Sequence, residues 1–207
     1  MQPFADSAFT QHQVFNLPGD DSASLVVLDW VSEGRSARGE HWDLQRFASR
    51  NEFFSAPAPA PSTGDLPLPS PPRRLMLRDA LVLEKDTDGL RQRMDGFTVF
   101  ATMMIRGPKF RRLAQCVLAR FADEPRIGGR NFDNRRDFKR DMARAGGVVW
   151  TAADVRGFVL VKVSGKELEH VRALLRDLLL GGGGGGGGDG ESEVLAEFGE
   201  GALLCLQ

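Results

Sequence analysis

The chain is 207 residues long, which permits one domain or a large domain with a small one. Its 27 Lys and Arg residues nearly balance its 28 Asp and Glu residues, so the formal net charge is −1. This balance excludes the strongly basic surface that is typical of nucleic-acid binding or of adhesion to an anionic membrane. With 42% hydrophobic and 27% charged residues, the composition is that of a globular protein with a sizeable core.

Strand-like runs rich in β-branched, aromatic and alternating residues dominate the first half of the chain. The run at Gly96–Ile105 carries apolar side chains on both faces, which predicts a strand covered on both sides. The run at Leu75–Lys85 alternates more clearly and places Leu81 and Leu83 on one face. The expected strands are His12–Leu17, Ser24–Trp30, Trp42–Phe54, Arg74–Glu84, Gly96–Ile105 and Val155–Val163.

Two segments in the second half show the period of amphipathic helices. Lys109–Ala122 gathers its apolar residues on one face. Lys166–Leu180 does the same with a leucine-rich face, and Ser164 with Glu167 fits a capping box at its start. The short apolar piece at residues 202–206 predicts a last strand or a docking tail. Together these patterns predict a mainly β fold with two late α-helices.

Three further segments have the composition of insertions. Residues 55–72 hold seven of the 11 prolines, which remove backbone donors and exclude a central strand or a helix. Residues 129–147 are charged and weakly periodic, and residues 181–190 include eight consecutive glycines, which lose much entropy on ordering. We therefore expect a single domain over residues 1–207 that is interrupted by these low-complexity loops.

Motifs that would indicate a standard enzyme are missing. The sequence contains no HExxH, no G-x-S-x-G and no Walker A motif, and its three histidines lack the i, i+4 spacing of a helical metal site. Cys116 and Cys205 are too few for a disulfide framework or a Cys-based zinc site, and their apolar surroundings predict small core residues. Residues 1–11 do not have the pattern of a secretory signal, so the cytoplasm is the expected compartment.

The densest group of functional side chains is residues 28–42, LDWVSEGRSARGEHW. One interpretation is a hairpin whose glycine-containing loop carries solvated charges. A second is metal binding, because carboxylates and a neutral imidazole are ligands for a divalent cation such as nickel. A third is acid–base catalysis by Asp29 and Glu40 as paired carboxylates, although no substrate-binding motif accompanies them. The candidate metal ligands in this segment are Asp29, Glu33, Glu40 and His41.

The pattern D-W-x-x-x-G-R-x-A-R-G-E-x-W in this segment resembles the signature of the urease accessory protein family UreD, also called UreH. Trp30 and the run that follows it, W-x-x-x-G-R-x-A-R-G-E, resemble fungal members of the family. Other segments resemble the family in the family's own order, so the resemblance covers nearly the whole chain outside the low-complexity loops. These segments are Ala5–Leu17, Ser49–Phe53, Leu75–Glu84, Phe100–Phe110 and Val159–Leu179.

The resemblance implies a mainly β fold, wound helically in two layers, and a non-enzymatic metallochaperone scaffold. Members of the family bind UreF, which recruits the GTPase UreG, and the assembly docks on apo-urease and permits nickel delivery. By this resemblance no cofactor is permanently bound, and nickel passes only transiently along a polar path. The two amphipathic helices become candidates for the UreF-facing surface, with core packing as the alternative.

The resemblance also assigns expected roles to individual residues. Glu40 and Asp79 rank first as weak nickel contacts because both fall on matched motifs. The implied set of nickel contacts or path-lining residues is Asp29, Glu33, Glu40, His41 and Asp79. The motif residues with structural roles are Gly34 and Gly39 in the turn, Arg35 as the partner of a carboxylate, and Trp42.

One departure from the family is expected. UreD proteins carry an N-terminal region with several strands before a Q-x-Q segment, whereas this chain has that segment at residues 11–13. We therefore expect an N-terminally truncated UreD-like chain whose open strand edges favour aggregation. The alternatives are a UreD-like fragment without activity and, in a different class, a carboxylate-dependent hydrolase.

Overall fold

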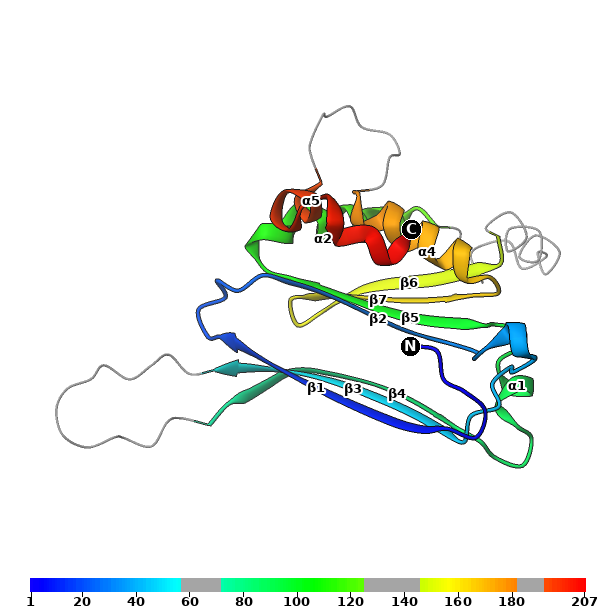
Figure 1. Cartoon of the computed structure of the whole chain (residues 1–207). Helices are drawn as coiled ribbons and strands as arrows, with labels where there is room; N and C mark the ends of the chain where they lie inside the picture. The colour runs from blue at the N-terminus through cyan, green and yellow to red at the C-terminus, as the bar shows by residue number, and fades with distance from the viewer. Residues whose placement is uncertain (57–71, 125–145, 182–191) are drawn as a thin grey trace, which may run out of the picture.

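The computed structural model describes residues 1–56, 72–124, 146–181 and 192–207. The three low-complexity loops expected at residues 55–72, 129–147 and 181–190 lie almost wholly outside the described residues. Their expected character therefore stays a prediction, as does the single domain over residues 1–207. Within the described residues the chain forms three stacked layers: a first sheet, a second sheet and a set of helices (Figure 1).

The first layer is a three-stranded sheet, here sheet A, with strand order β1-β3-β4. Strand β1 (Ala8–Pro18) pairs in parallel with β3 (Arg46–Ala56), which pairs antiparallel with β4 (Arg74–Glu84). Leu81 and Leu83 of β4 share the face that points toward the second sheet, as their alternation predicts.

The second layer is a four-stranded antiparallel sheet, here sheet B, with strand order β2-β5-β7-β6. Its strands are β2 (Leu25–Ser32), β5 (Val99–Arg106), β6 (Val148–Val155) and β7 (Phe158–Gly165). Strand β5 is central and lies between sheet A and the helices, so the prediction of a strand covered on both faces is confirmed (Figure 1).

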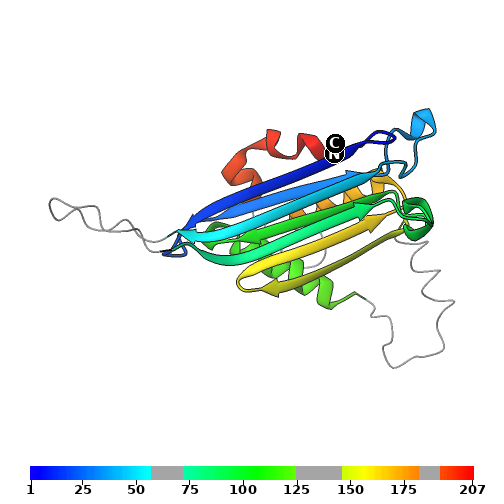
Figure 2. The same ribbon diagram turned by 90° about the horizontal axis from the view of Figure 1, so that it is seen from below.

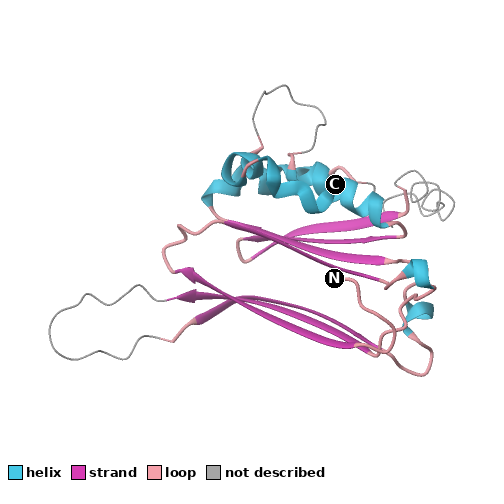
Figure 3. Cartoon of the chain, viewed as in Figure 1, coloured by secondary structure: helices cyan, strands magenta, loops and turns pink. Residues whose placement is uncertain are grey.

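The third layer consists of helices on the face of sheet B that points away from sheet A (Figure 3). Its main helices are α2 (Arg111–Ala122) and α4 (Leu168–Leu179), which confirm the two predicted helices to within a few residues. The short elements α5 (Glu193–Phe198), η2 (Pro108–Phe110) and η3 (Glu200–Leu206) complete the layer. The other short helices among the described residues are η1 (Ser36–Arg38) and α1 (Leu90–Arg93), at the ends of strands.

The fold class needs a correction. Strands make up about 40% and helices about 29% of the described residues, so the fold is mixed α/β rather than mainly β. The two sheets are open, and the described residues show no helical winding. Part of the unexpected helix comes from α5 and η3, and the apolar piece at residues 202–206, expected as a last strand or a docking tail, lies in η3 and is not a strand.

The hairpin interpretation of residues 28–42 is wrong. Strand β2 pairs with β5 in sheet B, whereas β3 pairs with β1 and β4 in sheet A. The segment between them crosses from one sheet to the other instead of turning back on its own strand. A glycine-containing loop between two strand-like runs is compatible with both geometries, so the local pattern could not decide between them.

A hairpin does occur where a single strand was predicted. The run at Val155–Val163 contains a tight turn at Arg156 and Gly157, whose φ angles are 56° and 78°. The turn ends β6 and begins β7, which pair with each other directly. Two successive positive φ angles are typical of the type I′ turn that joins antiparallel strands. The strand at residues 148–155 was missed because the preceding charged segment obscured its start.

Two further expectations are corrected by hydrogen bonds and exposure. Ser164 does not cap α4, because it lies in β7 and its hydroxyl donates to the carbonyl of Val99 at 3.1 Å. The N-cap of α4 is Glu167, which makes no side-chain capping bond. Cys116 and Cys205 are exposed and unpaired rather than small core residues.

The apolar core is divided by sheet B. Between sheet B and the helices lies the largest cluster, into which α4 buries Val171, Leu175 and Leu178. The buried apolar face of this helix therefore packs in the core, the alternative that was weighed against a UreF-facing surface. Two smaller clusters fill the opposite ends of the space between the sheets. Among the described residues no helix is long and apolar enough to cross a membrane.

Candidate functional site: a polar seam between the sheets

Polar side chains separate the two apolar clusters that lie between the sheets. On β3 the inward-facing positions run from Phe47 through Ser49 and Asn51 to Phe53. On β2, β4 and β5 a single polar residue likewise lies between two apolar ones on the same face, and on β7 Lys162 follows Leu160. We call this band the polar seam; it comprises Asp29, Ser49, Asn51, Asp79, Thr102 and Lys162.

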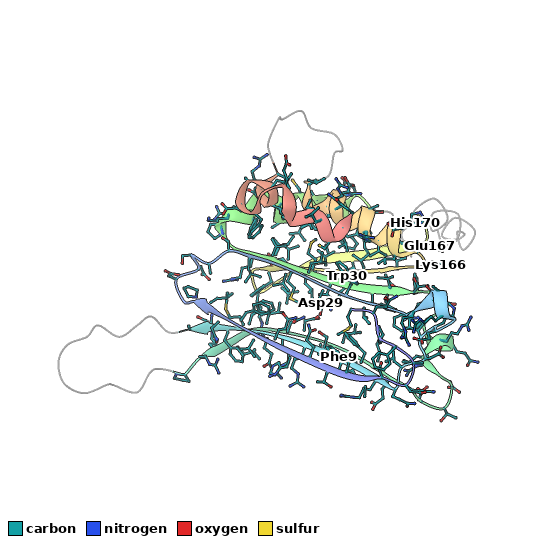
Figure 4. The ribbon with its side chains drawn as sticks, viewed as in Figure 1. Phe9, Asp29, Trp30, Lys166, Glu167 and His170 are labelled. Carbon is teal, nitrogen blue, oxygen red and sulfur yellow. The ribbon has the colours of Figure 1, made fainter. Side chains whose placement is uncertain are left out.

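Strand register brings the seam together from distant parts of the sequence. In sheet B, Asp29 is paired with Thr102, and Thr102 with Lys162, so the three form one row across β2, β5 and β7. In sheet A, Asn51 is paired with Asp79, which forms a second row across β3 and β4. The two rows face each other between the sheets, and Figure 4 shows Asp29 in this space.

Hydrogen bonds tie the two rows to each other. The ammonium group of Lys162 donates to Asp79 Oδ1 at 2.5 Å and to Thr102 Oγ1 at 3.0 Å. The carboxylate of Asp29 accepts bonds at Oδ2 from Gln11 at 3.2 Å and from Ser49 at 3.1 Å. Each carboxylate of the seam thus has partners on the opposite sheet, which offsets the cost of removing it from water.

A cavity of about 10 Å³ lies within the seam, close to the minimum volume that holds one water molecule. Asp29 and Asp79 both line it, together with Ser49, Asn51 and Thr102. Asn51 is only 2% exposed, and its Oδ1 has no hydrogen-bond partner among the described residues. A buried acceptor without a donor is rare, and it leaves this cavity with an unsatisfied oxygen that a donor or a cation would satisfy.

A wider groove of about 260 Å³ adjoins the cavity. Sheet A is narrower than sheet B, so in the view from below β7 and β6 extend past the edge of β4 (Figure 2). Leu81, Phe100 and Thr102 line both the cavity and the groove. The groove is mainly apolar, and the rest of its lining is Ala101, Val149, Trp150, Thr151, Lys162, Val163 and Ser164.

The glycine-rich motif forms a separate, locally closed structure, here called the 33–42 loop. The guanidinium of Arg35 donates two bonds to Glu40, Nε to Oε2 at 2.9 Å and Nη2 to Oε1 at 2.5 Å. Oε2 also accepts the backbone N–H of Ala5 at 3.1 Å. Hydrogen bonding by Arg35 lowers the pKa of Glu40 below its usual range. The role implied for Arg35, positioning a carboxylate, matches this bidentate pair.

The other motif residues fix the path of the loop. Gly34 and Gly39 have φ angles of 127° and 76°, a region that glycine adopts readily. Trp42 is 3% exposed and its indole N–H donates to the carbonyl of Phe97 at 2.8 Å. His41 Nδ1 lies 2.9 Å from Glu33 Oε2. The loop therefore anchors the crossing between the sheets, with Trp42 packed into the cluster at one end of the core.

The predicted site residues therefore separate into three groups. Asp29 and Asp79 meet at one cavity, Glu33 pairs with His41, and Glu40 is held by Arg35. Glu40 does not line the cavity that Asp29 lines, so the paired carboxylates of the hydrolase alternative do not meet there. The described residues contain no group of three or more His, Cys, Asp or Glu side chains that could hold a metal ion, so transient nickel stays a proposal.

Sequence reasoning missed Ser49, Asn51, Thr102 and Lys162 as members of the seam. A usable signal was present, because each lies at an inward-facing position with an apolar residue two positions away on at least one side. For Lys162 the signal was strong, since a lysine stands among the apolar residues of the run Phe158–Val163. Which of these positions meet depends on strand register, and the sequence of a single strand does not contain it.

Comparison with known proteins agrees with the resemblance of the motifs. The family model described as "UreD urease accessory protein" matches residues 1–181. Proteins of this kind are accessory scaffolds without catalytic activity, which argues against the hydrolase alternative and confirms the non-enzymatic expectation for the family.

Curated relatives come from fungi, bacteria and plants. An uncharacterized UreD-like urease accessory protein of Schizosaccharomyces pombe is 30% identical over 86% of this chain and 56% of its own length. Urease accessory protein 4 of Cryptococcus neoformans is 26% identical over 88% of this chain and 52% of its own length. Urease accessory protein UreD of Sorangium cellulosum is 32% identical over 77% of this chain and 40% of its own length. The chain thus spans about half the length of these relatives, and it belongs to the UreD urease accessory protein family.

Proposed function

We propose that this chain acts in urease maturation as a metallochaperone scaffold. In this proposal it binds UreF and, through UreF, UreG, docks on apo-urease and assists nickel insertion. Membership of the UreD family and relatives described as urease accessory proteins support the proposal. The two unpaired, exposed cysteines are compatible with a reducing compartment, so we place this step in the cytoplasm.

The observation that carries the nickel part of the proposal is the cavity of the polar seam. It combines two carboxylates, Asp29 and Asp79, with the unpartnered amide oxygen of Asn51 and with hydroxyl groups. Oxygen donors bind divalent cations, but they hold nickel less tightly than sites rich in imidazole or thiolate. A weak oxygen site suits an ion that must leave again.

The other predicted contacts take lower places in the proposal. Glu33 and His41 offer a carboxylate and an imidazole 2.9 Å apart, which suits a brief contact near the surface of the 33–42 loop. Glu40 would have to release the bidentate contact with Arg35 before it could touch a metal. We therefore rank Asp29 and Asp79 first, the Glu33–His41 pair second and Glu40 last.

The size of the cavity limits the form in which nickel could pass. A single water molecule needs roughly 10–15 Å³ of accessible cavity volume. The cavity, at about 10 Å³, therefore has room for about one water molecule, whereas the adjoining groove, at about 260 Å³, has room for several. An ion within the seam would therefore be largely stripped of water, with protein oxygens in place of its hydration shell.

Co-expression with the UreF of the same organism, followed by urease activation in a strain lacking its own UreD, tests this function. We expect the chain to co-purify with UreF and to restore activity. Asp79→Asn and Asp29→Asn should keep UreF binding and lower activation. Asp177→Asn serves as the matched control, because Asp177 is ion-paired with Arg120 at 2.5 Å on the far side of sheet B.

The possible results separate the parts of the proposal. Binding without activation by the unmodified chain would contradict the nickel-transfer part and leave the adaptor part. If Asp29→Asn and Asp79→Asn both still support urease activation, the seam is not part of the nickel path. An insoluble chain that does not bind UreF would indicate a fragment whose function belongs to a longer protein.

A further inference from the structure

We propose that Lys162 is the resident counter-cation of the polar seam and that an entering divalent metal ion displaces its ammonium group from Asp79 into the adjoining groove. This inference rests on the proposed passage of nickel through the seam. It adds a residue that was not among the predicted site residues and assigns it a positioning role: Lys162 keeps the seam assembled while no metal is present.

The first argument is charge. The charged groups of the seam are Asp29, Asp79 and Lys162, which sum to one negative charge. A divalent ion added beside the ammonium group would leave one positive charge between the sheets, whereas a divalent ion that replaces it would leave none. Because uncompensated charge is costly in a poorly hydrated interior, the metal and the ammonium group exclude each other.

The second argument is space. The ammonium group lies 2.5 Å from Asp79 Oδ1 and 3.0 Å from Thr102 Oγ1, so it occupies the oxygens that a metal ion would use. Both oxygens belong to residues that line a cavity with room for about one water molecule. This volume does not admit an ion beside the ammonium group. The lysine therefore has to move before a metal can contact Asp79.

The third argument is that the adjoining groove can accommodate the displaced side chain of Lys162. Its side chain is 39% exposed, whereas that of Asp79 is 13% exposed, so the pair lies at the boundary between the seam and solvent. Lys162 already lines the groove beside β6, whose other walls are mainly apolar. The methylene stem can lie along these walls while the ammonium group reaches water. Rotation of the side chain is sufficient, and no strand has to shift.

The fourth argument is the oxygen that Lys162 does not satisfy. Asn51 Oδ1 has no hydrogen-bond partner among the described residues, although Asn51 is paired in register with Asp79. The ammonium group of Lys162 leaves this acceptor to another partner, because an unpaired buried oxygen costs stability. A water molecule in the cavity could donate to this oxygen while the lysine is in place, and a metal held between Asp79 and Asn51 would take the place of that water and gain the amide oxygen as a ligand.

Amine labelling of the unmodified full-length chain tests the displacement directly. Reductive methylation is followed at each lysine by mass spectrometry, with and without nickel chloride. We expect nickel to accelerate the labelling of Lys162 several-fold, because its ammonium group leaves the ion pair. Lys109 is the matched control, since it is also ion-paired, with Glu197 at 2.6 Å, but lies in the helical layer. Its labelling should not change.

A variant provides a second measurement. Lys162→Met removes the competing charge and keeps a similar stem, so nickel should bind about three- to tenfold more tightly, as measured by calorimetry on chains verified to be folded. Lys109→Met should bind nickel like the unmodified chain. A lysine with a purely structural role would give no tightening and no change in labelling.

The outcomes distinguish this inference from the proposed function. Nickel binding that is lost in Asp79→Asn, together with unchanged Lys162 labelling and no tightening in Lys162→Met, would overturn the displacement and leave the nickel path intact. Absence of nickel binding to both the unmodified chain and Lys162→Met would overturn the nickel path itself and the displacement with it.

Discussion

The 33–42 loop and the polar seam contain similar side chains and use them in opposite ways. In the loop, Glu40 accepts three hydrogen bonds, from Arg35 and from the backbone of Ala5. In the seam, Asn51 Oδ1 has no partner among the described residues, and the ammonium group of Lys162 is partly open to solvent. The polar groups of the loop bond to one another, whereas the seam keeps an oxygen that is free to bind a metal ion or another ligand.

This difference shows that the density of polar residues along a sequence is a poor guide to function. The loop gathers its charges within ten residues because it has to turn the chain from sheet B to sheet A. The seam draws one or two residues from each of five strands, so no local stretch of sequence shows it. The following changes test whether the loop serves structure and the seam serves binding.

The largest expected effect on stability comes from Trp42→Ala. The indole is 3% exposed and packs with Phe47, Leu44 and Val31 between the sheets. Its removal leaves a large cavity, so we expect the free energy of unfolding to fall by about 3–5 kcal/mol. Chemical denaturation measures this loss. Trp42→Phe keeps most of the volume but leaves the carbonyl of Phe97 without its donor, and should cost about 1–3 kcal/mol.

A loss of less than about 1 kcal/mol in Trp42→Ala would contradict the anchoring role of the loop. Nickel binding should be unchanged in Trp42→Phe, because the indole contacts an apolar cluster and not the cavity. The pair of variants thus separates stability from binding at a buried position of the motif.

A glycine substitution gives the next largest effect. Gly34 has a φ of 127°, and a Cβ placed on it would lie 3.2 Å from Pro3 O and 3.3 Å from Glu40 O. Gly34→Ala should therefore lower the free energy of unfolding by about 1–3 kcal/mol. Gly39 is the matched control, since its φ is 76° and a Cβ there has no neighbour within 4 Å. Gly39→Asn should cost less than about 1 kcal/mol.

Equal losses at the two glycines would show that backbone strain alone matters and that the close approach of residues 3 and 40 to Gly34 does not. Thermal unfolding of the two variants, at the same protein concentration, is sufficient to rank them.

Much of the fold could be predicted from the sequence because it depends on local periodicity. The strand at Val99–Arg106 was identified, and its burial on both faces follows from the apolar residues on both of its faces. The two long helices were found for the same reason. The predicted cap of α4 was wrong, because Ser164 lies in the sheet and its hydroxyl donates to the carbonyl of Val99. A side chain with two possible partners cannot be assigned from spacing alone.

The candidate site could be predicted only in part. Asp29 and Asp79 were named from the motifs, and the structure brings both to one cavity. Their common partners depend on pairings across sheets, such as Thr102 with Lys162, that no local pattern contains. Trp42 adopts a φ of 62°, which bulky residues rarely do, so the sequence could not predict the sharp entry into β3.

A substitution within the seam should affect stability little and binding strongly. Asn51→Leu removes an acceptor that has no donor, so the free energy of unfolding should change by less than about 1 kcal/mol. Nickel binding, measured by calorimetry, should weaken because an oxygen ligand is lost. Asn51→Asp should bind nickel more tightly, since it adds a third carboxylate to the cavity. If Asn51→Leu lowers the free energy of unfolding but leaves nickel binding unchanged, Asn51 serves the fold and not metal binding.

The smallest expected effect is the acid sensitivity that Glu40 gives to the loop. Hydrogen bonding by Arg35 lowers the pKa of Glu40 in the folded chain below the ordinary value of 4.5. The folded state therefore holds this proton less tightly than the unfolded state, and the Arg35–Glu40 pair stabilises the fold above the ordinary pKa. The stabilisation is lost as the pH falls through the lowered pKa. Glu40→Gln lacks this contribution at every pH.

The difference in unfolding free energy between the unmodified chain and Glu40→Gln should thus be present at neutral pH and shrink below about pH 4.5. Denaturation series at several pH values measure it. Because the pair is partly exposed, the neutral-pH difference should be well below the loss in Trp42→Ala. If the difference does not depend on pH while nickel binding weakens, Glu40 contacts the metal, and the loop belongs to the path instead of only anchoring the strands beside it.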